Sequence, residues 1–230
     1  MKIKTRSGSH ETQREWVYHR IRLDLMAGRY QPGEKLTIAR LTASLGVSMT
    51  PVREALRRLA AERALEMNPN RSVAVPKLSI REVLEVRRIR EQLEGYAARL
   101  AARNIGAAQI ERLERIGRDL ATARARADAR GILRLNEAFH FTLYEAAGVR
   151  VLTDLIATLW LQSAPTLHLV LRPENIDCYP HAAQNRHNRA LLRALRVRDG
   201  RAAARAIAAE IAVASRVLGR LTTPGRRAKI

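Results

Sequence analysis

The clearest structural signal in the first third of the chain is the segment Leu45-Gly46-Val47-Ser48-Met49-Thr50-Pro51-Val52-Arg53-Glu54-Ala55-Leu56-Arg57-Arg58-Leu59. Gly46-Val47 predicts a tight turn. Pro51 suits the first turn of a helix over residues 50–63, where a missing N–H costs nothing. Apolar residues then recur at helical spacing and form one stripe for packing: Val52, Ala55, Leu56 and Leu59.

A second face of this predicted helix carries hydroxyl and guanidinium groups. Thr50, Arg53 and Arg57 follow one another at i, i+3 and i+7, and Ser48 precedes them in the turn. Arginine reads guanine with two hydrogen bonds in the major groove, and Ser and Thr reach phosphate or base edges. The pattern therefore favours a DNA-reading helix. The alternative for Arg53 is a surface ion pair with a neighbouring carboxylate.

The flanking sequence predicts two further helices and a hairpin. Residues 10–27 and 37–45 read as helices, and short apolar runs at 64–67 and 72–75 surround a basic tip. Helix, turn, helix and hairpin make a winged helix-turn-helix over residues 1–75, with a linker at 76–79. Arg71 at the tip either enters a minor groove or is simply exposed.

These segments resemble the DNA-binding domain of GntR-family transcriptional regulators. The resemblance rests on Gly33-Glu34-Lys35-Leu36, on Pro51-Val52-Arg53-Glu54-Ala55-Leu56 and on Pro69-Asn70-Arg71, and it covers residues 10–76. Of the family's usual DNA-contacting arginines, only Arg53 is kept in place. Met49 and Ala39 replace the others, with Arg40 beside Ala39, and Ser72 replaces a wing glycine. These departures from the family pattern predict an operator that differs from the family's usual one.

From residue 79 onward, the periodicity predicts only helices. The expected segments are 79–103, 106–124, 128–147, 149–171, 178–198 and 199–219. We expect a mainly α chain, with an all-helical antiparallel bundle over residues 80–222 and a basic tail over 223–230.

This region resembles the ligand-binding domain called FCD, of the FadR subgroup of the same family. The matching pieces are Val86 to Glu94, Ala97 to Ala102, Asn136 to His140, and Asn188 to Asp199. The resemblance implies a helical bundle with a central effector pocket. The polar residues expected to line that pocket are Arg90, Arg134, Asn136, His140, Asn188 and Glu210.

Two of these residue types have a stated chemical role. An arginine can hold a carboxylate effector with two hydrogen bonds, and Arg90 and then Arg134 are the candidates. Glu210 is expected to pair with one of them, or to favour a ligand with an amine or hydroxyls. The alternatives are a core histidine at His140 and an i, i+4 ion pair between Arg90 and Glu94.

Many such domains hold a divalent metal through one Asp and three His. Here the four positions are Asn136, His140, Asn188 and Glu210, and His187 lies one residue out of register. Imidazole and carboxylate suit Zn, Ni or Mn, whereas amides bind them poorly. We expect no required cofactor. If a metal binds, its ligands are His140, Glu210 and His187.

The charge balance identifies polyanions as partners. The 230 residues include 42 Lys and Arg against 22 Asp and Glu, a net charge of +20. Nucleic acid is the first candidate for such a field, and membrane surfaces and acidic proteins are the alternatives that composition alone does not separate. No apolar run reaches the length of a membrane span, and a single cysteine fits a reducing, cytoplasmic, nucleoid-associated location.

These patterns together predict a homodimeric regulator, most simply a repressor, that binds a double-stranded DNA operator and responds to a small carboxylate. A change in domain spacing, transmitted through residues 76–79, would couple effector binding to DNA binding. No phosphate-binding loop, nucleophile elbow or zinc-protease motif is present, so an enzyme is not expected. The alternative is a nonspecific basic nucleic-acid-binding protein with a vestigial sensor domain.

Overall fold

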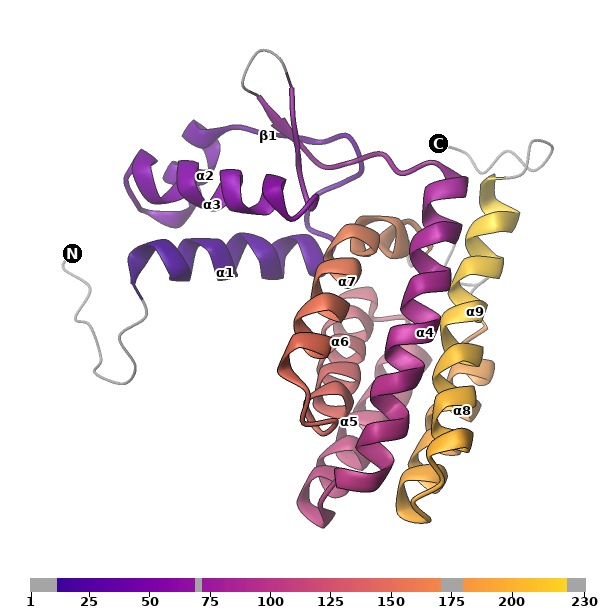
Figure 1. Ribbon diagram of the computed structural model, residues 1–230. Coiled ribbons are helices and arrows are strands. Elements are labelled where there is room, and N and C mark those ends of the chain that lie inside the picture. Colours follow the sequence, from indigo (N-terminus) through magenta and orange to yellow (C-terminus); the bar gives the residue numbers. More distant parts are fainter. Residues whose placement is uncertain (1–11, 69–71, 171–179, 223–230) are drawn as a thin grey trace.

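The computed structural model describes residues 12–68, 72–170 and 180–222, which form a small N-terminal unit joined to a bundle of long helices (Figure 1). The prediction of a mainly helical chain with a winged helix-turn-helix before a helical bundle is confirmed.

Three helices build the N-terminal unit: α1 (Gln13–Met26), α2 (Ile38–Leu45) and α3 (Met49–Ala61). The turn between α2 and α3 begins at Gly46, whose φ of 66° is the left-handed conformation that glycine adopts without strain. The predicted apolar stripe of α3 packs on α1, and the side chains at this contact are fully or almost fully buried: Val17, Ile21, Leu25, Val52, Ala55, Leu56 and Leu59.

A small antiparallel sheet completes this unit. Strands β2 (Glu66–Met67) and β3 (Val73–Ala74) form the predicted hairpin, whose tip at 69–71 lies outside the described residues. The sheet order is β1-β3-β2, so a third strand, β1 (Lys35–Leu36), pairs with β3. Strand β1 was not predicted from the sequence.

Gly33 fixes the approach to β1. Its N–H donates to the Val75 carbonyl at 2.8 Å, and its φ of +81° is again left-handed. A Cβ at this position would lie 2.1 Å from Cε of Lys77. The left-handed backbone conformation favours glycine at this position, and a larger residue would also make the exposed Lys77 side chain move aside.

The six predicted helices of the second unit are all present, within a few residues of their expected ends. They are α4 (Ile80–Asn104), α5 (Ala107–Ala125), α6 (Ala129–Glu145), α7 (Arg150–Val170), α8 (His181–Arg196) and α9 (Gly200–Thr222). Helix α4 runs alongside α9, α8 packs on α9, and α5 packs on α6 (Figure 1). Buried alanines on α4 let the helix axes approach closely: Ala97, Ala98, Ala101 and Ala102.

The two units touch directly as well as through the linker. Helix α1 packs against α7, and the Gln162 side chain on α7 donates from Nε2 to the Glu62 carbonyl, just after α3, at 3.1 Å. The linker itself is anchored, because Pro76 is buried and Ser79 forms a capping box with Glu82 at the start of α4. The direct contact was not predicted.

Candidate nucleic-acid interface and interior polar cluster

The outer face of α3 is polar and open. Thr50, Arg53 and Arg57 are exposed on the side opposite the buried stripe, and Ser48 is exposed at the N-cap, where its side chain makes no capping hydrogen bond. The structure therefore places these four residues together on one surface, as the helical spacing predicted. A protruding helix of this kind fits the major groove.

The arginines of α3 differ in whether an acidic side chain of the protein neutralises them. Arg58 pairs with Glu62 at 3.2 Å, and its guanidinium lies 3.7 Å from the Tyr18 ring centroid. Among the described residues, Arg53 and Arg57 have no acidic partner. Glu54, the carboxylate next to Arg53, pairs instead with Arg14 at 3.0 Å. Both guanidiniums are thus free to meet an external anion or a base edge.

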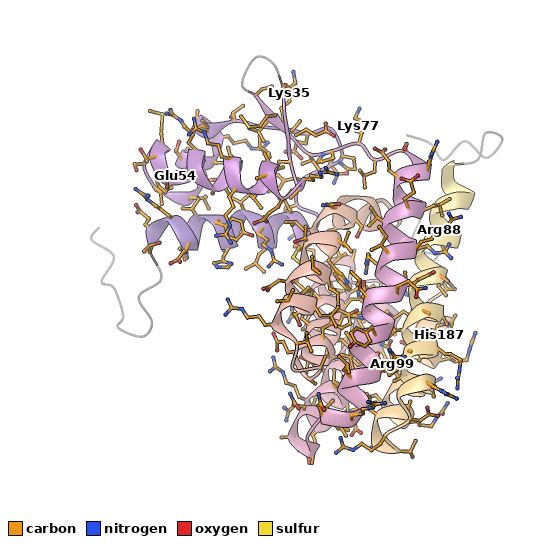
Figure 2. The ribbon with its side chains drawn as sticks, viewed as in Figure 1. Lys35, Glu54, Lys77, Arg88, Arg99 and His187 are labelled. Carbon is orange, nitrogen blue, oxygen red and sulfur yellow. The ribbon has the colours of Figure 1, made fainter. Side chains whose placement is uncertain are left out.

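The remaining predicted DNA contacts are less direct. Arg40 is exposed on α2 but pairs with Glu34 at 2.8 Å. Arg71 lies outside the described residues. Lys35 on β1 and Lys77 in the linker that follows β3 are also exposed and add positive charge near the sheet (Figure 2).

Inside the bundle, a buried carboxylate organises a chain of polar groups. Glu94 is 0% exposed. Its Oε1 accepts from Nε of Arg90 at 2.6 Å and from Nε1 of Trp160 at 2.9 Å, and its Oε2 accepts from the hydroxyl of Tyr144. The chain continues to His140, whose Nδ1 lies 2.8 Å from the Tyr144 hydroxyl oxygen and whose Nε2 lies 3.2 Å from Oε1 of Glu210.

Arg90 is held by the protein itself. Besides its bond to Glu94, it donates from one terminal nitrogen to the Ser163 hydroxyl at 3.0 Å, and its guanidinium lies over the Trp160 ring. The structure thus contains the Arg90–Glu94 pair that was the alternative to effector binding. An acid ligand placed here would compete with Glu94 and would face a second buried carboxylate at Glu210.

Glu210 is held in its charged form by its neighbours. Burial alone raises the pKa of Glu210, but His140, Arg124 and His187 outweigh it and lower the pKa below its ordinary value. The prediction that Glu210 pairs with Arg90 or Arg134 is therefore wrong: its partner is His140. Arg124, which is also buried, was not singled out from the sequence, because one arginine near a helix end gives no local signal.

The other predicted effector residues are dispersed. Arg134 is exposed, since it points away from the buried face of α6, and it does not belong to this interior cluster. Asn136 and His187 are half-buried. Asn188 is buried, and it lines a groove between α5 and α8 rather than joining the His140–Glu210 contact.

The donor set does not fit a tightly held transition metal. Two of the four positions are amides, and both ring nitrogens of His140 face protein oxygens. Within the described part of the chain, no three His, Cys, Asp or Glu side chains lie close enough together to hold an ion.

Comparison with known proteins assigns both units. Residues 13–75 match the model for bacterial regulatory proteins of the gntR family, and residues 85–212 match the FCD domain, which is more than half of the chain. The chain belongs to the GntR family, with an FCD effector-binding domain.

Relatives within the GntR family support the assignment along the chain. The HTH-type transcriptional regulator McbR of Escherichia coli (strain K12) is 32% identical over 183 residues, 80% of this chain and 82% of that protein. The HTH-type transcriptional repressor RspR of the same organism is 28% identical over 159 residues, 69% of this chain and 70% of that one.

Solved structures agree. The structure of E. coli McbR/YncC superposes with a TM-score of 0.86 at 27% identity, and the match covers 93% of this chain and 100% of that one. A regulator from Rhodococcus sp. RHA1 has a TM-score of 0.73 at 20% identity and shares the fold. The match covers 94% of this chain and 100% of that one.

The helices were also compared with the requirements for a membrane span. Within the described residues, none combines the length and the apolar character that crossing a membrane requires.

Proposed function

We propose that this GntR-family regulator binds a pseudo-palindromic DNA operator as a homodimer, represses the genes it controls, and is released by a small organic anion bound in its helical domain. It acts by binding, without turnover of that ligand. The proposed binding to DNA rests on the outer face of α3. There Arg53 and Arg57 are exposed and have no acidic partner among the described residues.

A homodimer follows from the size of the reading surface. One α3 covers a single half-site, and two-fold related units placed one helical turn apart read a palindrome. The bundle offers apolar surface for such a contact. Ile89 and Tyr96, seven residues apart on α4, are 51% and 44% exposed, and a dimer contact would cover surface of this kind.

Repression and release are supported by the relatives and by the junction between the units. RspR is named a repressor. In this chain, Ser163 contacts Arg90 of the interior cluster, and its neighbour Gln162 holds the end of α3. A ligand that shifts α7 would therefore move the reading helix. The coupling expected of such a device is about 1–3 kcal/mol.

A second candidate function is nonspecific binding of nucleic acid. It is favoured by the net charge of +20 and by Met49 and Ala39, which stand at the two positions where the family resemblance implies arginine. In this case phosphate contacts would supply the affinity, and sequence would matter little.

Selection of bound duplexes from a random pool, at about 150 mM salt, separates the two. Wild type should yield a palindromic consensus that is occupied by two chains per duplex. Arg53→Ala should yield a clearly weaker consensus. The matched control is Arg112→Ala, which removes an exposed positive charge on α5. Retention of all sequences alike by every variant would reject the specific regulator, and one chain per duplex would reject the two-groove arrangement.

A further inference from the structure

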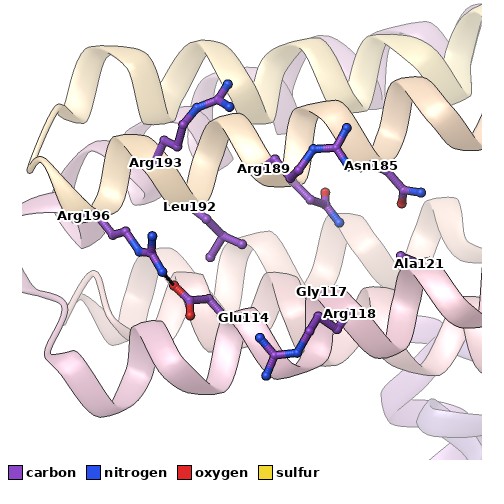
Figure 3. A pocket seen from close by; sticks show the side chains of 10 residues that line it. Glu114, Gly117, Arg118, Ala121, Asn185, Arg189, Leu192, Arg193 and Arg196 are labelled. Carbon is purple, nitrogen blue, oxygen red and sulfur yellow. Dashed lines mark ion pairs between the residues drawn. The ribbon is translucent and has the colours of Figure 1, made fainter.

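A groove of about 400 Å³ runs between α5 and α8, within the size range of small-molecule sites. Leu192 of α8 reaches towards α5 across it, an ion pair between Arg196 and Glu114 closes one end, and Asn185 and Ala121 lie at the other (Figure 3). The groove is separate from the Arg90–Glu94 contact.

The groove carries excess positive charge. Arg118, Arg189, Arg193 and Arg196 line it, against a single carboxylate at Glu114. Arg196 is neutralised by Glu114. The other three arginines have no acidic partner within the described residues. Arg189 and Arg193 stand one turn apart on α8, so that both can reach one anion.

The floor of the groove holds an amide that lacks partners. The Asn188 residue is 4% exposed, and neither Oδ1 nor Nδ2 of its side chain has a hydrogen-bond partner among the described residues. Buried polar groups in folded proteins are nearly always paired, so an orphaned carboxamide that lines a cavity points to a missing ligand. A group that both accepts and donates would satisfy it, and a hydroxyl does both.

We propose that the α5–α8 groove binds a sugar phosphate. The sugar hydroxyls would pair with the Asn188 amide, and the phosphate would bind Arg189 and Arg193. A phosphate monoester carries close to two negative charges and three strong acceptor oxygens. Four arginines and one glutamate line the groove, and a phosphate balances this excess of positive charge better than a singly charged carboxylate ligand would. This inference rests on the proposed function, in which the helical domain binds a small anion.

The groove also connects to the interior cluster. Arg124 donates to Oδ1 of Asn185 at 2.7 Å, and the same arginine lowers the pKa of Glu210, the partner of His140. A ligand in the groove would therefore act on Asn185 and, through Arg124, on the electrostatic environment of Glu210.

Calorimetric titration and thermal unfolding of the full chain without DNA test the proposal. The probes are a panel of pentose and hexose phosphates, with the parent sugars, the matching sugar acids and inorganic phosphate as comparisons. At least one sugar phosphate should bind saturably and raise the unfolding temperature. Its affinity should exceed that of the matching sugar acid and of phosphate by about tenfold or more.

Three variants assign that binding to the groove. Asn188→Leu keeps the side-chain volume and removes both orphaned atoms, so it should raise the unfolding temperature of the ligand-free protein and abolish the response to ligand. Arg189→Ala should weaken binding by about tenfold or more. Arg112→Ala, on the opposite face of α5, should leave it unchanged.

Several results would overturn the assignment. These are the absence of saturable binding by any sugar phosphate, equal binding of sugar acids, and equal binding by wild type, Asn188→Leu and Arg189→Ala. Because the titration contains no DNA and the operator selection contains no ligand, failure of this proposal leaves the DNA-binding proposal standing, and the reverse is also true.

Discussion

Arg53 and Arg58 lie five positions apart on α3, and their neighbours decide what each can do. Arg58 is occupied by Glu62 and the Tyr18 ring, so it ties α3 to α1. Glu54, the carboxylate next to Arg53, pairs with Arg14 instead of Arg53. An ion pair between exposed groups contributes little to stability. Here the Glu54–Arg14 pair matters because it leaves a guanidinium available for DNA.

The buried pair of His140 and Glu210 predicts a pH dependence of stability. The pKa of Glu210 is lowered in the folded chain from an ordinary value of 4.5. Its charge therefore stabilises the fold above pH 4.5, and this contribution is lost as the pH falls through the lowered value. Glu210→Gln should cost about 2 kcal/mol in free energy of unfolding at pH 7, and the gap to wild type should shrink in acid.

Denaturant unfolding from pH 3 to pH 7 measures this gap. Glu111→Gln, an exposed residue on α5, serves as the control and should show a small gap that does not change with pH. A gap for Glu210→Gln that stayed constant over the whole range would contradict a charged Glu210 in the folded chain.

At the residue scale, helical spacing predicted neighbours on one helix well and neighbours across helices poorly. The outer face of α3 and the i, i+4 pair of Arg90 with Glu94 follow from spacing alone. The contact of His140 with Glu210 joins residues 70 apart in the sequence. The resemblance to a known ligand set placed these two residues together. Arg134, the second candidate for holding an effector carboxylate, instead points to solvent.

At the scale of elements, α7 is the link between the two units. It packs against α1, and Gln162 holds the Glu62 carbonyl at the end of the reading helix. The next residue on α7, Ser163, accepts from Arg90 and so belongs to the interior cluster. One helix therefore touches both the reading helix and the buried polar chain.

Gln162→Leu should loosen this link without harming the bundle. The change removes a hydrogen bond worth about 1 kcal/mol and keeps the side-chain size. Amide hydrogen exchange should become faster in residues 56–65, at the end of α3, and stay unchanged in α4 and α9. Gln92→Leu, an exposed change on α4, should alter neither region. Equal exchange at residues 56–65 in wild type and Gln162→Leu would mean that the contact does not hold α3.

Element prediction succeeded where the pattern was long. All six bundle helices span at least 16 residues and show a clear apolar period. Strand β1 has two residues, Lys35 and Leu36, and its partner β3 lies 38 positions further along the chain. No period can be read from two residues, and the pairing depends on the turn at Gly33, so the sequence pattern alone could not reveal it.

For the whole molecule, the family motifs predicted the fold, and the net charge predicted the class of partner. A charge of +20 brings any polyanion to the surface, but it cannot say whether sequence is read. The groove between α5 and α8 joins segments about 70 residues apart, so its cluster of arginines becomes visible only once the bundle is assembled.

Helix α3 reads base sequence in this description of the molecule. A comparison of the Kd for the selected operator with the Kd for a scrambled duplex, at about 150 mM salt, tests this directly. Wild type should prefer the operator by about 1,000-fold or more. Arg53→Ala should lower that ratio by about tenfold to a hundredfold, and Arg112→Ala should leave it unchanged. Equal affinity of wild type for both duplexes would contradict the account.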